Sequence, residues 1–233
     1  MSHYVVTGGA GFIGSAIVER LEAEGHRVAV LDREGQYAAD LSDEEAVRTA
    51  ARQVLADHER CDVLVHAAAS FELAALTDLK AELFRRVMAV NVEAPLWLLQ
   101  ELSPGMSERG HGRVVFIVSD TFFNPPPVPY MLPYITSKGA LIGAARSLAK
   151  SLGPQGITVN CVAPGMTPPP GGGMGQDLAD VERDLVEDVR QRQSVPRSLV
   201  PMDVAQVVAF LVRSESGALT GQTLCPDGGL VFR

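Results

Sequence analysis

The sequence predicts a single α/β domain in which a doubly wound, mostly parallel sheet is flanked by helices. Short apolar runs rich in Val and Ile alternate with longer amphipathic segments along the chain, the order expected of strands connected by helices. The runs lack polar alternation, so their strands are expected to be buried on both faces. A chain of 233 residues suits one sizeable core, and a second complete domain would be cramped.

Six strands are expected, and each is a short run of mostly apolar residues. They are Tyr4–Thr7, Arg27–Leu31, Asp62–His66, Arg113–Ser119, Ile157–Ala163 and Gln222–Cys225. The interval from Asp32 to Asp40 is short. We therefore expect the outer helix and strand after the second strand to be shortened or missing.

Helices are expected between the strands, at Gly11–Glu24, Asp43–His58, Leu79–Met106, Tyr134–Leu152 and Asp203–Arg213. Ser42 followed by Glu45 predicts a capping box at the start of the second helix. Pro95 lies inside the third segment and predicts either two helices or one bent helix, because proline removes a helical hydrogen bond.

One segment departs from this alternation. Residues 164–176 contain four prolines and five glycines, and residues 177–190 form an acidic amphipathic stretch with Leu178, Val181, Leu185 and Val189 on one face. The segment follows a strand end, where α/β sheets keep their ligand crevice. It therefore predicts a substrate loop or lid at about residues 165–200, with a surface excursion as the alternative.

Composition and charge exclude several classes of partner. The net charge of −8 argues against nucleic acid and anionic membrane surfaces, which both favour basic patches. The three cysteines are far apart without metal-ligand spacing, which predicts no metal site and fits a reducing compartment. No leader-like segment precedes the first strand, and the longest apolar runs are too short to span a bilayer. A cytoplasmic protein is therefore expected.

A glycine-rich turn between the first strand and the first helix predicts a Rossmann-type nucleotide site. The segment supplies G-x-G-x-x-G in the required context, through Gly8, Gly9, Gly11, Phe12, Ile13 and Gly14. Glycines let a pyrophosphate approach the backbone, and the helix N-terminus supplies free N–H groups.

Asp32 selects the nucleotide. It ends the second strand 18 residues after Gly14, where a carboxylate can accept both hydroxyls of the adenosine ribose. The same charge would repel the 2′-phosphate of NADP, so NAD is the predicted cofactor. Arg33 beside it could partner a phosphate, but it competes with Asp32.

Tyr134 and Lys138 lie at i and i+4 of a helix and share one face. A free phenol has a pKa of about 10, too high for a base near neutrality. A nearby fixed cation favours the phenolate, so the pair can exchange a proton with a carbonyl or alcohol oxygen. A surface pair without a role is the alternative.

These motifs together resemble the short-chain dehydrogenase/reductase family over essentially the whole chain. The resemblance implies that Tyr134 is the acid/base, and that Lys138 lowers its pKa and holds the nicotinamide ribose. It also implies that Ser119 polarises the substrate oxygen and that Asn91 holds a water linked to Lys138. The interval from Ser119 to Tyr134 is about two residues longer than is usual in the family. Thr121 is therefore an alternative for the hydroxyl that polarises the substrate oxygen.

The resemblance implies further cofactor contacts. They are Asp40 and Leu41 at the adenine, Ala67 and Ala68 after the third strand, and Pro164, Gly165 and Thr167 at the nicotinamide. The chain mixes two branches of the family, because Gly11–Gly14 and His66–Ala69 look like the extended branch. Its length leaves no room for the extended branch's C-terminal substrate domain. His66 ends a buried strand and is interpreted as a hydrogen-bonded structural histidine.

The expected substrate is a small, uncharged, largely apolar alcohol or ketone, aromatic or alicyclic. Phe71, Thr121, Phe122 and Met166 are expected around the crevice, where no Arg or Lys cluster would grip an anion. Core packing or an oligomer contact is the alternative for the aromatic residues.

The predicted activity is NAD-dependent interconversion of a secondary alcohol and a ketone. The alternatives are a dihydrodiol dehydrogenase, an epimerase or dehydratase with tightly held NAD, and a non-catalytic NAD-responsive binding protein. The resemblance also implies a homotetramer or homodimer, formed through the Leu79–Met106 and Tyr134–Leu152 helices and the last strand.

Overall fold

The computed structural model describes residues 2–169 and 179–232. In this part of the chain, seven strands form one sheet in the order β3-β2-β1-β4-β5-β6-β7, and every neighbouring pair is parallel. The strands are β1 (His3–Thr7), β2 (Arg27–Asp32), β3 (Tyr37–Ala38), β4 (Val63–His66), β5 (Gly112–Ile117), β6 (Ile157–Val162) and β7 (Thr223–Leu224). The predicted doubly wound parallel sheet is therefore confirmed, with the two-residue β3 as an addition at its edge.

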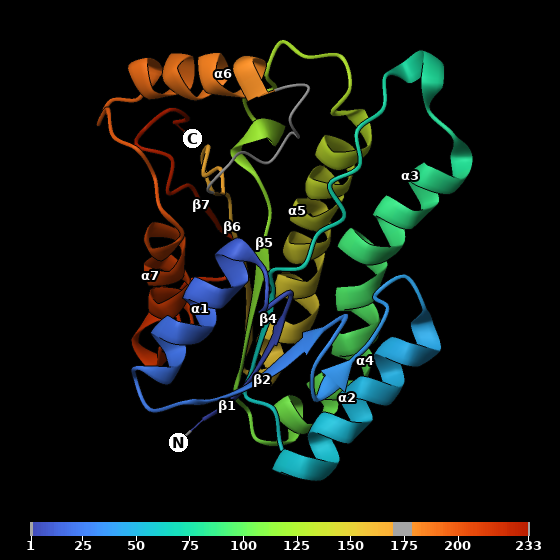
Figure 1. The fold of residues 1–233 in the computed structure, drawn as a ribbon. Helices are drawn as coiled ribbons and strands as arrows, with labels where there is room; N and C mark the ends of the chain where they lie inside the picture. The colour runs from blue at the N-terminus through green and yellow to red at the C-terminus, as the bar shows by residue number, and fades with distance from the viewer. Residues whose placement is uncertain (1, 170–178, 233) are drawn as a thin grey trace.

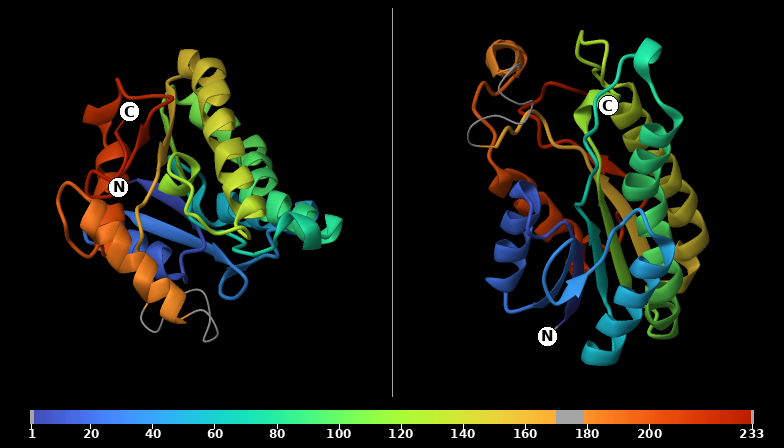
Figure 2. Two further views of the ribbon diagram at one scale, coloured as in Figure 1. Left: turned by 90° about the horizontal axis from the view of Figure 1, so that it is seen from above. Right: turned by 45° about the vertical axis from the view of Figure 1, so that its right-hand side comes forward.

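Helices cover both faces of this sheet (Figure 1). They are α1 (Phe12–Glu22), α2 (Glu44–His58), α3 (Ala81–Met88), α4 (Ala94–Glu108), α5 (Leu132–Leu152), α6 (Ala179–Arg192) and α7 (Pro201–Leu211). α1 and α7 pack on one face, and α2, α4 and α5 pack on the other (Figure 2). Every residue of β4, β5 and β6 is buried, as their unbroken apolar runs predict. None of the described helices is long and apolar enough to cross a membrane.

The long segment around Pro95 forms two helices. A single π-helical turn, Ala89–Glu93, joins α3 to α4 and contains Asn91. Pro95 lies in the first turn of α4, where its missing N–H is tolerated. The missing N–H also leaves the Asn91 carbonyl without its usual i+4 donor. The interruption thus places Asn91 in an irregular, buried turn beside the carboxyl end of the sheet.

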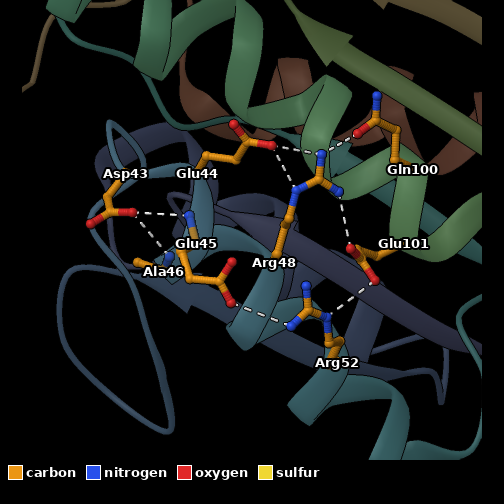
Figure 3. A network of polar contacts seen from close by, with 8 residues as sticks. All are labelled: Asp43, Glu44, Glu45, Ala46, Arg48, Arg52, Gln100 and Glu101. Carbon is orange, nitrogen blue, oxygen red and sulfur yellow. Dashed lines mark hydrogen bonds and ion pairs between the residues drawn. The ribbon is translucent and has the colours of Figure 1, made fainter.

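The cap of α2 differs from the predicted one by one residue (Figure 3). Asp43 is the N-cap, and its carboxylate accepts from the N–H groups of Glu45 (2.9 Å) and Ala46 (3.2 Å). The Ser42 hydroxyl instead donates to Asp40 Oδ1 at 2.7 Å. The predicted Ser42–Glu45 capping box is therefore wrong, because the adjacent aspartate satisfies the first N–H groups.

Arg48 joins α2 to α4 through an ionic network on the surface (Figure 3). Its guanidinium donates to Glu44 (2.8 Å), to Glu101 (3.0 Å) and to Gln100. Surface ion pairs contribute little net stability, so we expect Arg48→Ala to lower the melting temperature by at most a few degrees. Thermal unfolding at low and high salt checks this, and a large, salt-independent loss would contradict it.

Candidate active site

Two adjoining cavities open at the carboxyl ends of the strands. The first, the glycine cleft, has a volume of about 680 Å³ and lies between the turn after β1, the end of β2 and residues 67–72. The second, the tyrosine pocket, has a volume of about 300 Å³ and lies between residues 117–121, α5 and residues 164–169. They share the lining residues Ile13, Ala67, Ala69, Phe71, Thr167 and Pro169. The strand order reverses between β1 and β4, the point where α/β sheets bind ligands.

The glycine cleft requires glycine for steric reasons. Gly8 has a φ of +67°, and a Cβ there would lie 2.6 Å from the Ala68 backbone. A Cβ on Gly14 would lie 2.0 Å from the Gly8 carbonyl oxygen. Gly11 is the N-cap of α1. Among the described residues no side chain caps the N–H groups of the first helical turn, and this turn borders the cleft. This backbone fits an anion such as a pyrophosphate.

Most of the predicted nucleotide contacts line the glycine cleft. They are Gly8, Gly11, Phe12, Ile13, Gly14, Asp32, Asp40, Leu41, Ala67, Ala68 and Thr167. Gly9 does not line it, since it packs beneath the turn, where a Cβ would meet Val30 at 2.8 Å. Pro164 and Gly165 line the tyrosine pocket instead.

Asp32 lines the glycine cleft at the end of β2. Its carboxylate accepts from the N–H groups of Ala10 (3.0 Å) and Arg33 (2.7 Å), which fixes it beside the glycine turn. Hydrogen bonds from Ser42 lower the pKa of the neighbouring Asp40. The cleft is also lined by Arg33 and by Arg86 of α3. No motif in the sequence indicated Arg86.

Ser119, Tyr134 and Lys138 meet in the tyrosine pocket. Ser119 follows β5, and its Oγ accepts from the Thr121 hydroxyl at 2.8 Å and from the Thr121 N–H at 3.3 Å. Tyr134 and Lys138 lie one turn apart on α5, and Lys138 Nζ is 5.5 Å from the centroid of the Tyr134 ring. Thr121 thus holds the Ser119 hydroxyl through two hydrogen bonds and also lines the pocket.

Burial dominates the electrostatics of this group. Burial raises the pKa of Tyr134 to about 12, although its hydrogen bond with Ser119 acts in the opposite direction. Burial lowers the pKa of Lys138 to about 8, and its ammonium donates to the Ile117 carbonyl at 2.8 Å. The predicted lowering of the phenol pKa by Lys138 stays a prediction, with the ammonium 5.5 Å from the centroid of the Tyr134 ring.

Asn91 lies beneath the site and lines neither cavity. Its side-chain oxygen accepts from the Ser70 N–H at 2.6 Å, and its amide donates to the Ser70 carbonyl (3.1 Å) and to Ser137 Oγ (2.9 Å). These bonds connect the π turn both to residue 70, which lines the glycine cleft, and to the residue before Lys138. Asn91 is therefore placed to hold this part of the site together.

His66 is fully buried at the end of β4. Its Nδ1 lies 2.8 Å from the Thr7 hydroxyl, which also accepts from the Ala68 N–H at 3.3 Å. Burial, aided by the charge of Lys138, lowers the pKa of His66 to about 3. A neutral histidine that links the ends of β1 and β4 agrees with the structural interpretation.

Three of the four predicted substrate residues line the tyrosine pocket, namely Phe71, Thr121 and Met166. The Phe71 ring meets Tyr134 edge-on, with centroids 4.8 Å apart. Phe122, the fourth predicted substrate residue, does not line the pocket. Its ring packs over Gly139 of α5, where a Cβ would lie 2.4 Å from it.

α6 lies above the carboxyl ends of the strands (Figure 1), and residues of this helix reach the tyrosine pocket. Leu185, Val189 and Arg192 contribute to the lining. Met174, Leu178 and the side chain of Val181 lie outside the described residues.

The tyrosine pocket is also lined by charged groups that the sequence did not indicate, namely Asp120, Glu182 and Arg192. Arg192 is a single guanidinium, 3.0 Å from Asp188. Among the described residues, no group of three His, Cys, Asp or Glu side chains could hold a metal ion.

Comparison with known proteins gives consistent results. A family model described as enoyl-(acyl carrier protein) reductase matches residues 8–231. The probable galactose dehydrogenase GalD of Rhizobium meliloti is 32% identical over 97% of this chain and 93% of its own. The 3-oxoacyl-acyl-carrier-protein reductase MabA of Mycobacterium tuberculosis is 33% identical over 97% of this chain and 91% of its own. The solved short-chain dehydrogenase/reductase from Serratia marcescens matches with a TM-score of 0.85 and 30% identity, covering 98% of this chain and 97% of that one.

Proposed function

The chain belongs to the short-chain dehydrogenase/reductase family, and from this premise we propose that it interconverts a secondary alcohol and a ketone with NAD. One observation carries the proposal: Ser119, Tyr134 and Lys138 line a pocket that shares a wall with the glycine cleft. A substrate oxygen near Ser119 and Tyr134 would therefore lie beside a nucleotide bound in the cleft.

The cofactor fits the residues that line the glycine cleft. The close backbone approaches at Gly8 and Gly14 and the uncapped start of α1 suit a pyrophosphate. Asp32 would accept the adenosine ribose hydroxyls, and Asp40 would lie near the adenine. The bound nicotinamide supplies or accepts the hydride.

Proton transfer is assigned to the tyrosine pocket. In carbonyl reduction, the Tyr134 phenol donates its proton to the carbonyl oxygen, and the Ser119 hydroxyl donates a hydrogen bond to the same oxygen. Burial favours the protonated phenol, the form that donates in reduction, and the charge of Lys138 would favour the phenolate that oxidation requires. Lys138 would hold the nicotinamide ribose, and Asn91 would position the turn beneath it. In alcohol oxidation the proton moves in the reverse direction.

The pocket favours a small substrate that is largely apolar. Phe71, Met166 and the α6 residues Leu185 and Val189 supply apolar lining. The single Arg192 is paired with Asp188, which offers little to grip an anion. We propose an uncharged aromatic or alicyclic alcohol or ketone, bound beside the described parts of the predicted substrate segment, residues 165–169 and 179–200. Turnover of charged substrates alone, in a panel containing cyclohexanone and acetophenone, would overturn this part.

The assembly and location belong to the same proposal. A homotetramer or homodimer is what the family resemblance implies, and a cytoplasmic location fits three cysteines that lie far apart in the sequence without metal-ligand spacing.

The choice of NAD is tested by titrating NADH and NADPH into the wild type and Asp32→Ala. Hydrogen bonds to a charged group are worth about 1.5–3 kcal/mol, so we expect the variant to bind NADH about 10- to 100-fold more weakly. Its preference for NADH over NADPH should disappear, because the charge that repels a 2′-phosphate is gone.

Glu34→Ala is the matched control for this titration, since it removes an exposed charge two residues away that does not line the cleft. Equal or tighter NADPH binding by the wild type would reject the role of Asp32 and implicate Arg33 and Arg86. Absence of binding by either nucleotide would favour a non-catalytic protein. NAD carried through purification, with turnover independent of added cofactor, would favour an epimerase or dehydratase.

A further inference from the structure

The tyrosine pocket contains a carboxyl group to which the mechanism above gives no role. Asp120 follows Ser119, lines the pocket and is only 5% exposed. Its N–H donates to the Pro164 carbonyl at 3.2 Å, which ties it to the loop after β6. Withdrawing a carboxyl group from water is costly, so its position beside the reacting groups needs an explanation.

Ser119 is the centre of a hydrogen-bonded cluster. Its Oγ accepts from the Thr121 hydroxyl at 2.8 Å, and Asp120 and Tyr134 line the same pocket, where both their side chains interact electrostatically with the Ser119 hydroxyl. A serine hydroxyl has one proton to donate. If that proton points to Asp120, it is not available to a substrate carbonyl in the pocket.

We propose that Asp120 is a positioning residue that sets the direction of the Ser119 hydroxyl and thereby the balance between reduction and oxidation. This inference rests on the proposed function of Ser119 and Tyr134. An ionised Asp120 accepts the Ser119 proton and leaves the Ser119 oxygen to accept from a substrate alcohol. A protonated Asp120 donates to the Ser119 oxygen and frees the Ser119 proton for a carbonyl. The Thr121 hydroxyl can donate or accept a hydrogen bond, so it can stay bonded to Ser119 whether Asp120 is ionised or protonated.

The surroundings place this change near neutral pH. Burial raises the pKa of Asp120 to about 7, and the negative charge of Asp227 adds to the effect. The oxygens of Asp227 accept from the N–H groups of Gly229 and Val231, each at 2.9 Å, which fixes that charge behind the pocket. Because the Asp120 pKa is raised, the protonated form extends from acid pH up to about 7, and the ionised form prevails above it.

Other ionisable groups also face this pocket. They are Tyr134 and Lys138 on α5, and Glu182 and Arg192 on α6. Burial lowers the pKa of Lys138 to about 8, close to that of Asp120. The assignment of a pH transition must therefore come from variants and not from its midpoint.

The first test observes Asp120 without turnover, by carbon-13 NMR of protein labelled at the aspartate carboxyls. We expect one carboxyl to titrate near pH 7 in the wild type and to vanish in Asp120→Asn. Ser119→Ala should move that transition to higher pH, because the carboxylate loses a hydrogen-bond donor. Asp227→Asn should move it to lower pH, because a negative neighbour is lost.

Asp78→Asn is the matched control, since it makes the same change at an exposed residue of the 3₁₀ turn Leu76–Asp78. It should leave the transition in place. The inference is overturned if no carboxyl titrates near neutral pH, or if Ser119→Ala leaves the transition where it was.

The second test follows cyclohexanone reduction with NADH and cyclohexanol oxidation with NAD between about pH 6 and 8. We expect kcat for reduction to fall, and kcat for oxidation to rise, as Asp120 ionises, by up to about tenfold per pH unit. In Asp120→Asn both dependences should flatten, and the KM for NADH should change little, because Asp120 does not line the glycine cleft.

The two tests separate this inference from the proposed function. An active enzyme whose pH profiles are the same in Asp120→Asn and wild type overturns the role of Asp120 and leaves the dehydrogenase proposal standing. A wild type that binds NADH but turns over no ketone overturns the dehydrogenase proposal, while the NMR titration still decides whether Asp120 and Ser119 are coupled.

Discussion

Tyr134→Phe is expected to lower kcat for cyclohexanone reduction by about a hundredfold to ten-thousandfold, the range that a positioned proton donor contributes. The substitution removes the phenolic proton and retains the ring that Phe71 contacts edge-on. NADH affinity should change little, because Tyr134 lines the tyrosine pocket and not the glycine cleft. Steady-state kinetics with NADH, combined with calorimetric titration of the nucleotide, separates the two effects.

Tyr130→Phe is the matched control. It deletes the same hydroxyl four residues earlier, on the loop before α5, and Tyr130 lines neither cavity. We expect it to retain kcat within a few-fold. Full activity in Tyr134→Phe would refute the assignment of the acid/base and make Thr121 and Ser119 the remaining hydroxyls to test.

The order of strands and helices was predictable because each element has a strong local signal. Unbroken Val and Ile runs indicated strands with both faces buried, and β4 and β5 are buried at every position. The glycine turn was equally clear, since a Cβ at Gly8 or Gly14 would collide with backbone. Such steric demands are local, so the sequence reveals them without knowledge of the tertiary structure.

The direction of side chains in loops was harder to predict. Phe71 and Phe122 are both aromatic residues near the crevice, yet Phe71 lines the pocket and Phe122 packs over Gly139. The difference depends on how the proline-containing loop after β5 folds back onto α5. The cap at Ser42 failed for a similar reason, because neighbouring polar side chains compete for the same N–H groups.

Charged residues contributed by separate helices were missed altogether. Arg86 reaches the glycine cleft from α3, and Arg192 reaches the tyrosine pocket from α6. Their contribution depends on the rotation and docking of each helix, which hydrophobic periodicity fixes only approximately. Asp120 was missed although it adjoins Ser119, because its significance comes from burial and from the distant Asp227.

Gly14→Ala should abolish most NADH binding, by about a hundredfold or more, which corresponds to roughly 2.7 kcal/mol. The added Cβ would lie 2.0 Å from the Gly8 carbonyl oxygen, 2.8 Å from its carbon and 3.0 Å from Gly9 Cα. All three are backbone atoms, so α1 must move away from the turn that would receive the pyrophosphate. Overpacking of this kind also costs about 1–3 kcal/mol of folding stability. Calorimetric titration of NADH, together with thermal unfolding, measures both losses.

Gly143→Ala distinguishes this local collision from a general effect of replacing glycine. Gly143 lies inside α5, and a Cβ there would meet nothing within 4 Å. We expect this control to bind NADH normally and to gain about 0.5–1 kcal/mol of stability, because alanine favours the helix. If Gly14→Ala does not fold, Gly11→Ala gives a milder version, since its Cβ would lie 3.1 Å from the Gly8 carbonyl oxygen. Wild-type affinity in a folded Gly14→Ala variant would mean that the pyrophosphate does not rest on this turn, and the nucleotide would have to be placed elsewhere.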